Sequence, residues 1–220
     1  KTTRLYRNID GVLTNYPLSA VSGSAYGGLG AGDLDNDGWT DFALTGYGNA
    51  GMIGEVYRFN GAGTLFSLAT NGLSKLWLGA AEWGDLDNNG WQDVVISGED
   101  AAGRRALQVY ANTGGGLSNR PTQIPGLRIS SVAVGDGDGD GDLDLAVSGL
   151  ATNGYTSAIF RNLAPVSNAP PGAPTGLSAT LTNGNEIVFR WEAASDDLTP
   201  SASLSYNLHV GTASNPVAVA

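Results

Sequence analysis

The stretch Asp33-Leu-Asp-Asn-Asp-Gly-Trp-Thr-Asp41 recurs twice in this 220-residue chain, as Asp85-Leu-Asp-Asn-Asn-Gly-Trp-Gln-Asp93 and as Asp136-Gly-Asp-Gly-Asp-Gly-Asp-Leu-Asp144. The first aspartates of the three stretches are 52 and 51 residues apart. Self-similarity at a period of roughly 20–50 residues is the sequence mark of repeat proteins, in which each repeat is one supersecondary unit. A period of this length fits a four-stranded unit, so the three stretches predict a repeat protein.

Each stretch carries oxygen ligands at the spacing that Ca²⁺ requires. Ca²⁺ takes about 6–8 oxygen ligands at about 2.3–2.6 Å, and carboxylates at positions 1, 3 and 5 of a loop can surround one side of the ion. Position 6 is Gly38, Gly90 or Gly141, where the chain must turn sharply and a positive φ is expected. A backbone carbonyl at position 7 and a carboxylate at position 9 complete the shell, which predicts three bound ions. The predicted ligand residues are Asp33, Asp35, Asp37, Trp39, Asp41, Asp85, Asp87, Asn89, Trp91, Asp93, Asp136, Asp138, Asp140, Asp142 and Asp144.

An EF-hand loop also begins with alternating aspartates, but it ends in a bidentate glutamate at position 12 and lies between helices. Position 12 is Leu44, Ile96 or Val147 in this chain. The residues after position 9 are apolar runs that stop at glycine, which is typical of a buried strand. Each loop is therefore predicted to lead into a strand. An acidic turn without metal is the less favoured alternative, because it would not require Asp or Asn at positions 1, 3 and 5 of every copy.

A second repeated segment follows the same period without using the acidic residues. Its aromatic residues are 51, 53 and 50 positions apart. There are four such segments for three acidic loops, so the chain is expected to begin inside a unit whose first half is absent, and to be part of something longer. The four segments are Leu5-Tyr-Arg-Asn8, Val56-Tyr-Arg-Phe-Asn60, Val109-Tyr-Ala-Asn112 and Ile159-Phe-Arg-Asn162.

The acidic loop, the apolar strand ending in Ser/Thr-Gly and the later aromatic-Arg-Asn strand together resemble FG-GAP/VCBS repeats, the calcium-bearing blades of integrin-α-like β-propellers. The resemblance covers roughly residues 1–165, and the propeller segment is placed at 1–163. It implies one four-stranded antiparallel blade per repeat, with the metal loop joining the first two strands. Two departures are Asn89, which replaces a carboxylate and is expected to weaken the second site, and Asp142, which stands where the other loops have tryptophan.

The expected fold is all-β, with three complete four-stranded blades and part of a fourth. The units are placed at about 1–22 (partial), 23–74, 75–126 and 127–163. In the second complete unit, strands are expected at 78–83, 93–98 and 105–112, with a fourth between 116 and 124. Closed propellers have about 4–8 blades, so the ring would need further sequence or a cover for its open edges.

The residues after 163 are predicted to form a different module. Residues 164–175 are an uncharged, proline-rich linker. Segments 177–181, 186–191 and 204–210 then alternate apolar and polar residues, as half-buried strands do. They resemble the first half of a fibronectin type III sandwich, which needs about seven strands. Residues 176–220 are therefore expected to be an incomplete and poorly stabilised β-sandwich.

The composition agrees with metal-site chemistry. The formal net charge is −10, from 21 acidic and 11 basic residues, and the chain has no cysteine. Twelve of the acids lie in the three stretches. The acidity argues against a nucleic-acid partner, which would require basic patches. Millimolar calcium is extracellular, so a secreted or cell-surface location is expected, as in bacterial surface proteins. No membrane insertion is expected in this segment.

The sequence offers little for catalysis. The only histidine is His209, and there is no nucleophile elbow, phosphate loop or zinc spacing. The predicted function is a non-catalytic, calcium-stabilised module that mediates adhesion or binds a protein or glycan. The alternatives are an accessory module of a larger secreted polysaccharide-active enzyme and a structural spacer.

Binding, if present, is expected on the variable turns that follow the second strand of each unit, at 46–54, 98–103 and 149–156. The tyrosines Tyr26, Tyr47 and Tyr155 lie in glycine-rich turns and are the candidates for surface contacts. Trp39 and Trp91 are expected to pack against a neighbouring blade; the less favoured alternative is stacking on a ligand such as a sugar.

Overall fold

The structure is a computed structural model that describes residues 2–16, 21–59, 61, 66–70, 72–163, 170–182, 184, 186–197, 199, 201, 204, 206–208 and 210. Its elements are all β-strands, which confirms the predicted all-β class. The strands are β1 (Leu5–Ile9), β2 (Val12–Tyr16), β3 (Leu29–Gly32), β4 (Asp41–Gly48), β5 (Gly51–Phe59), β6 (Phe66–Thr70), β7 (Ala81–Gly84), β8 (Asp93–Glu99), β9 (Arg105–Asn112), β10 (Leu117–Arg120), β11 (Arg128–Gly135), β12 (Asp144–Ala151), β13 (Gly154–Phe160), β14 (Thr175–Thr182) and β15 (Glu186–Glu192).

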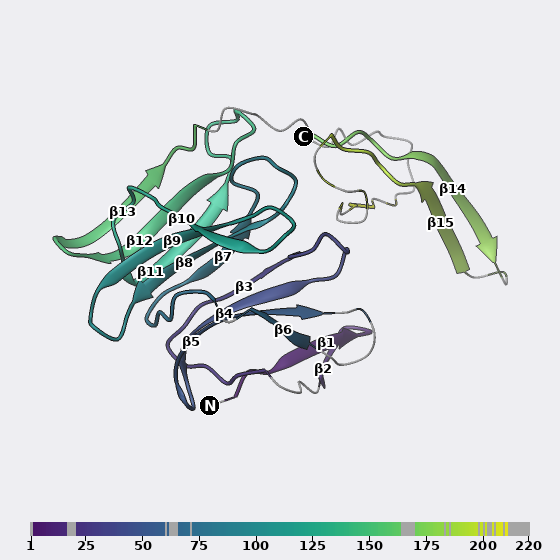
Figure 1. The fold of residues 1–220 in the computed structure, drawn as a ribbon. Coiled ribbons are helices and arrows are strands. Elements are labelled where there is room, and N and C mark those ends of the chain that lie inside the picture. The colour runs from purple at the N-terminus through teal and green to yellow at the C-terminus, as the bar shows by residue number, and fades with distance from the viewer. Residues whose placement is uncertain are drawn as a thin grey trace.

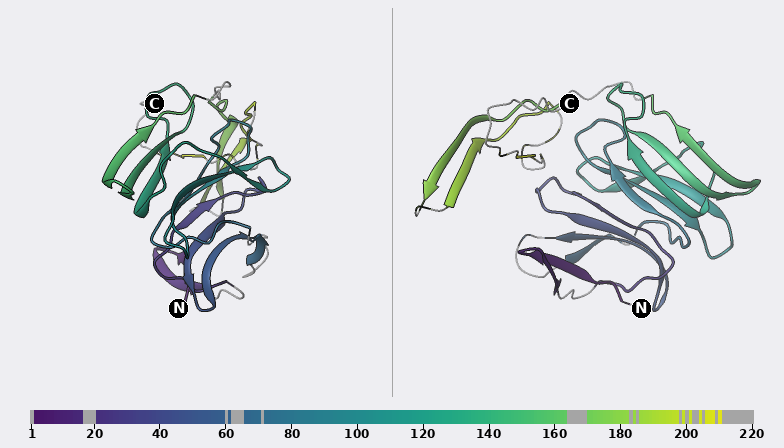
Figure 2. Two further views of the ribbon diagram at one scale, coloured as in Figure 1. Left: turned by 60° about the vertical axis from the view of Figure 1, so that its left-hand side comes forward. Right: turned by 180° about the vertical axis from the view of Figure 1, so that it is seen from behind.

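Most of these strands form three antiparallel sheets in which sequence neighbours pair (Figure 1). The first sheet is β3-β4-β5-β6, the second is β7-β8-β9-β10 and the third is β11-β12-β13. Their first strands lie together, since β3 contacts β7 and β7 contacts β11. The three sheets thus fan out from a common line of first strands in a propeller-like arrangement, which Figure 2 shows from two further sides. A fourth strand of the third sheet would follow β13, and residues 164–169 lie outside the described part of the chain.

The hairpin β1-β2 corresponds to the second half of a unit. Tyr6 in β1 holds the repeat position of Tyr57 in β5 and Tyr110 in β9. Both later tyrosines are buried, whereas Tyr6 and every other residue of β1 are exposed. The difference arises because β5 and β9 are inner strands of four-stranded sheets, while β1 pairs only with β2.

The core consists of apolar layers between neighbouring sheets. Ala43 and Val56 of the first sheet pack with Ile96 and Trp83 of the second. Val95 and Val109, from the opposite face of the second sheet, pack with the third. The second sheet is therefore covered on both sides, which explains why the run Val94-Val-Ile96 is apolar without alternation and fully buried.

The Ser/Thr-Gly end of the second strand has a structural reason. Thr45 is buried, and its hydroxyl accepts a hydrogen bond from the backbone N–H of Gly28 at 3.1 Å. Gly46 has a φ of 126°, and a Cβ there would lie 2.2 Å from the Ser24 hydroxyl oxygen. The equivalent Gly98 has a φ of 148°. Only glycine fits a positive φ at such a close approach.

The first strand of the second unit begins later than predicted. The expected start at residue 78 is wrong, because β7 begins at Ala81. Leu78 has a φ of 52°, outside the strand region. Its N–H donates to the carbonyl of Tyr26 at 2.5 Å, and its own carbonyl accepts from the N–H of Ile129 at 2.5 Å. These three residues hold equivalent repeat positions, so their backbones link successive units before each sheet starts.

The C-terminal segment forms the hairpin β14-β15, as expected for 177–181 and 186–191. The strand expected at 204–210 is wrong for the residues described there, which have no strand conformation. Tyr206 instead contacts Trp191 through its ring and accepts a hydrogen bond from the N–H of Ala194 at 2.9 Å. Alternation in sequence produces a strand only where a sheet edge is available to pair.

His209 lies outside the described residues. Among the described residues, no helix has the length and apolar character needed to cross a bilayer.

Candidate metal centres

Each acidic stretch forms a loop between the first two strands of its sheet. Loop 1 (33–40) joins β3 to β4, loop 2 (85–92) joins β7 to β8, and loop 3 (136–143) joins β11 to β12. Position 9 of each stretch is the first residue of the second strand, paired with the last residue of the first strand. All three loops therefore lie at the same end of their sheets, opposite the β4-β5 and β8-β9 turns.

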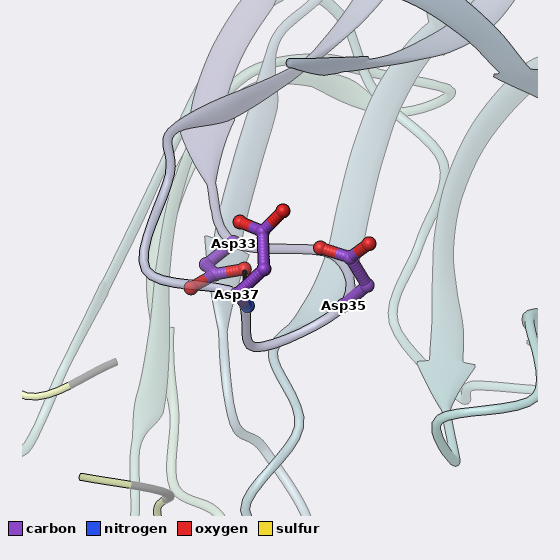
Figure 3. Close-up of side chains that lie close together, drawn as sticks. All are labelled: Asp33, Asp35 and Asp37. Carbon is purple, nitrogen blue, oxygen red and sulfur yellow. Dashed lines mark hydrogen bonds between the residues drawn. The ribbon is translucent and has the colours of Figure 1, made fainter. Parts of the chain in front are cut away.

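The loops are shaped by hydrogen bonds from their own backbone. In loop 1, Asp33 accepts from the N–H groups of Asp37 at 3.2 Å and Gly38 at 2.9 Å, and Asp37 accepts from that of Trp39 at 2.8 Å. Figure 3 shows these aspartates on one tight turn of the chain. Loops 2 and 3 repeat the pattern, with Asp85 bonded to Asn89 and Gly90, Asn89 to Trp91, Asp136 to Gly139 and Gly141, and Asp140 to Asp142. The predicted positive φ is confirmed at Gly38 (85°), Gly90 (84°) and Gly141 (90°).

Three groups of carboxylates lie close enough to share an ion. In each group the three ligand oxygens are within 4.8 Å of one another. Two oxygens bound to one Ca²⁺ at about 2.3–2.6 Å can be no more than about 5.2 Å apart, so this spacing suits a single calcium ion. The three Asp-rich groups could therefore hold metal ions. They are Asp33, Asp35 and Asp37 in loop 1, Asp85, Asp87 and Asp93 in loop 2, and Asp136, Asp138 and Asp144 in loop 3.

The aspartate at position 9 also clamps its loop to the sheet. Asp93 is fully buried, and its two oxygens accept the backbone N–H groups of Leu86 at 3.1 Å and Asn112 at 2.8 Å. Asp41 does the same with Leu34 and Phe59. Asp144 bonds Gly137 and Asn162 in the same way. Each clamp joins position 2 of the loop to the end of the third strand.

Burial of these carboxylates without a cation has an electrostatic cost. Loss of water raises the pKa of Asp41 and of Asp93 from the ordinary value of 3.8 to about 6, and nearby aspartates add to the rise. One oxygen each of Asp35 and Asp87 is buried without a hydrogen-bond partner among the described residues. Orphaned carboxylate oxygens in a ring of hard oxygen donors fit a bound calcium ion.

An arginine neutralises part of each loop. Arg58 on β5 lies 2.7 Å from Asp35, and Arg161, at the equivalent position after β13, pairs with Asp138 and Asp140. The second unit has Ala111 at this position, and Arg120 on β10 takes over, 3.7 Å from Asp87. These arginine side chains are about half exposed.

The remaining predicted ligand residues have other contacts. The side chain of Asn89 bonds the Trp91 N–H and donates to the carbonyl of Asn112 at 2.9 Å. The Asp142 side chain accepts from the Asn88 amide of loop 2 at 2.7 Å. Trp39 was expected to pack on a neighbouring blade, but its ring contacts Phe59 of its own sheet, with centroids 5.5 Å apart, and is half exposed. Trp91 likewise packs on Gly114, beyond the end of β9 in its own unit.

Asparagine side chains tie the three loops to one another, which the sequence alone did not indicate. The amide of Asn112 donates to the carbonyl of Leu34 in loop 1 at 2.8 Å and to that of Gln92 in its own loop at 3.2 Å. Asn162 makes the same bridge from loop 3 to loop 2, through Leu143 and Leu86. The sequence marks this residue only through the recurrence of asparagine at the end of the aromatic-Arg-Asn segment.

Two further contacts reinforce the boundary between loops 1 and 2. The amide of Asn36 donates to the carbonyl of Gly90 at 2.7 Å. The N–H of Asp33 donates to the side chain of Gln92 at 2.8 Å. Asn36 and Asn88 occupy the same loop position, and both have a φ of 54°, which asparagine tolerates better than most residues.

The fold and the loops define an all-β repeat protein whose acidic loops are arranged for cations. A model of the FG-GAP-like repeat matches residues 33–96 and again residues 85–147, a span of just over half of the chain. The chain therefore belongs to the FG-GAP-like repeat family. The integrin alpha-3 chains of Cricetulus griseus and Mus musculus are each 32% identical to it over 156 residues. The match covers 66% of this chain and 13% of those relatives, so the chain spans a small part of their length.

Proposed function

We propose that this chain is a calcium-binding, non-catalytic β-propeller segment of a secreted or cell-surface protein, which acts in adhesion by binding a protein or glycan. The observation that carries the proposal is the threefold loop geometry, with three ligand oxygens within 4.8 Å of one another in each loop. Membership of the FG-GAP-like repeat family supports the adhesive role that the resemblance to integrin-α-like propellers implies. The proposed organisation is propeller residues 1–163, a linker at 164–175 and a partial fibronectin-like module at 176–220.

The residues present fit calcium, and they would hold it at positions 1, 3, 5, 7 and 9 of each loop. Bound Ca²⁺ would supply positive charge to carboxylates whose ionised form is disfavoured by burial. The chain's own residues supply the shape, because the backbone hydrogen bonds to Asp33 and Asp85 form the turn without help from the ion. The position-9 clamps then link each loop to the end of the third strand, so an ion would stiffen the whole sheet edge.

Calorimetry on chelator-treated protein tests this function. Titration with calcium should reveal three sites and a rise in melting temperature, with each ion adding about 1.4–2.7 kcal/mol at 10–100 times its Kd. Asp41→Ala, Asp93→Ala and Asp144→Ala should each remove one site. A melting temperature that does not respond to millimolar calcium would contradict the proposal.

A further inference from the structure

A groove of about 930 Å³ lies between the first and second sheets, at the end opposite the metal loops. One wall is the β4-β5 turn with Tyr47 and Met52, and the other is the β8-β9 turn, residues 100–104. The floor is the connection before β7, including Lys75 and Leu76. The groove therefore lies on the turns where variable binding surfaces were expected.

The β8-β9 turn is fixed in shape. Asp100 accepts hydrogen bonds from the backbone N–H groups of Ala102 and Arg104, each at 2.9 Å. Its carboxylate also pairs with the Arg104 guanidinium at 2.7 Å, and its N–H donates to the Arg104 carbonyl. These bonds lower the pKa of Asp100, which stays ionised. The one acidic side chain of the groove is thus already neutralised by Arg104.

Two cationic side chains of the groove have no such partner. Lys75 and Arg105 line the groove and form no ion pair with any described residue. With Arg104 and Asp100, the lining carries three positive charges and one negative charge. A local excess of positive charge in a chain of net charge −10 is a marked asymmetry. At about 0.15 M salt the Debye length is about 8 Å, so the remote carboxylates of the metal loops are largely screened from a ligand here.

Tyr47 lines the groove, and it belongs to a row of three aromatic rings. Trp77 lies between Tyr26 and Tyr47, with ring centroids 6.4 Å and 6.3 Å apart. Tyr26 is 69% exposed and Tyr47 is 44% exposed. The edge-on contact of Tyr26 and the tilted contact of Tyr47 with Trp77 hold the two tyrosines in place while much of their surface faces solvent.

We propose that this groove binds an acidic oligosaccharide, with Lys75 and Arg105 pairing with its carboxylates and Tyr47 and Tyr26 contacting its sugar rings. The proposal rests on the proposed binding function and names its ligand class. The C–H face of a pyranose packs on an aromatic ring, whose face carries negative potential. A guanidinium forms charge-assisted hydrogen bonds to a carboxylate.

The lining favours a sugar over an acidic peptide. Protein interfaces are usually anchored by large apolar or aromatic side chains buried in pockets. Here the large apolar lining is limited to Tyr47, Met52 and Leu76, and Leu76 is already buried in the core. The other lining residues are small, polar or charged, and a repeating polar chain with flat apolar faces matches this surface better.

The test uses the full chain in millimolar calcium and a hyaluronan decasaccharide as the probe, followed by calorimetry. The unmodified chain should bind the probe, and Arg105→Gln and Tyr47→Ala should each weaken binding at least about tenfold. Arg190→Gln is the matched control, because Arg190 is exposed on β15 and its loss removes the same charge outside the groove. Melting curves with calcium should be unchanged in all three variants.

Three results would overturn the proposal. The first is no binding of the decasaccharide, and the second is an equal loss of affinity in Arg190→Gln, which would indicate diffuse charge attraction. The third is equally tight binding of a poly-glutamate peptide of the same charge, which has no sugar face. Each of these would leave the calcium-dependent scaffold intact if calcium still raises the melting temperature. Absence of that rise would contradict the proposed function instead.

Discussion

The two ends of the sheets differ in how much they repeat. At the metal end, all three loops are eight residues long and share the same hydrogen bonds from backbone to positions 1, 5 and 9. At the opposite end, the β4-β5 turn has two residues and the β8-β9 turn has five. The loops at one end share the contacts that join the sheets and the acidic groups that could hold ions, whereas the turns at the other end differ in length, as loops that carry recognition often do.

The largest expected difference between the two ends concerns stability. Asp93→Ala would leave the buried N–H groups of Leu86 and Asn112 without an acceptor, and should cost about 2–4 kcal/mol of unfolding free energy. Asp100→Ala removes an aspartate of similar connectivity at the turn end, where water can replace its bonds, and should cost much less than Asp93→Ala. Urea denaturation of both variants in calcium checks this contrast. Equal losses would show that the turn end is as structural as the metal end.

The features that could be predicted from the sequence are the local ones, and those that depend on the packing of the sheets could not be predicted. The loops and most strand bounds of the second unit could be predicted because aspartate spacing and apolar runs are local patterns, and their backbone consequences are local too. The bridge from Asn112 to Leu34 could not be predicted, since 78 positions separate the two residues and only the packing of the sheets brings them together. The groove lined by Arg105 and Tyr47 could not be predicted from the sequence for the same reason. The strand expected at 204–210 failed because alternation does not supply a pairing partner.

The asparagine bridges give a second contrast, between equivalent positions of the repeat. Asn112 is buried and joins loops 1 and 2, whereas Asn8 holds the same repeat position in the exposed β1-β2 hairpin and accepts a local hydrogen bond from the N–H of Gly11. Asn112→Ala should therefore lower the unfolding free energy by about 2 kcal/mol, because two partly buried carbonyls lose their donor. Asn8→Ala should change it by less than about 0.5 kcal/mol. A loss in Asn112→Ala no larger than in Asn8→Ala would contradict the role of the bridge.

The third contrast is between low and neutral pH in the metal-free protein. Burial raises the pKa of Asp93 in the folded state to about 6, above its ordinary value of 3.8, so the folded state binds more protons than the unfolded state between these pH values. The contribution of Asp93 to stability is therefore greatest at about pH 4 and decreases as the pH rises to 6. Asp41 acts in the same direction. Calcium requires ionised carboxylates, so its stabilising effect should change in the opposite direction, growing as the pH rises.

Denaturation of chelator-treated protein from pH 4.5 to 7 measures this dependence. Asp93→Asn is the control, because it keeps the side-chain shape and removes one titrating group. Its stability should fall less steeply with rising pH than that of the unmodified chain. Identical slopes would show that Asp93 does not titrate in this range.

The smallest expected effect is a difference in calcium affinity between loop 2 and loop 1. Loop 2 has Asn89 where loop 1 has Asp37, so its site offers one carboxylate fewer and should bind calcium least tightly. Asn89→Asp should raise the affinity of that site several-fold, yet it also removes the bond from the Asn89 amide to the Asn112 carbonyl, worth about 1 kcal/mol. The two effects oppose each other, so the melting temperature in millimolar calcium should hardly change. The reverse variant, Asp37→Asn, should weaken the first site, as calorimetry would measure. If neither change alters any site's affinity, position 5 shapes the loop without contacting the ion.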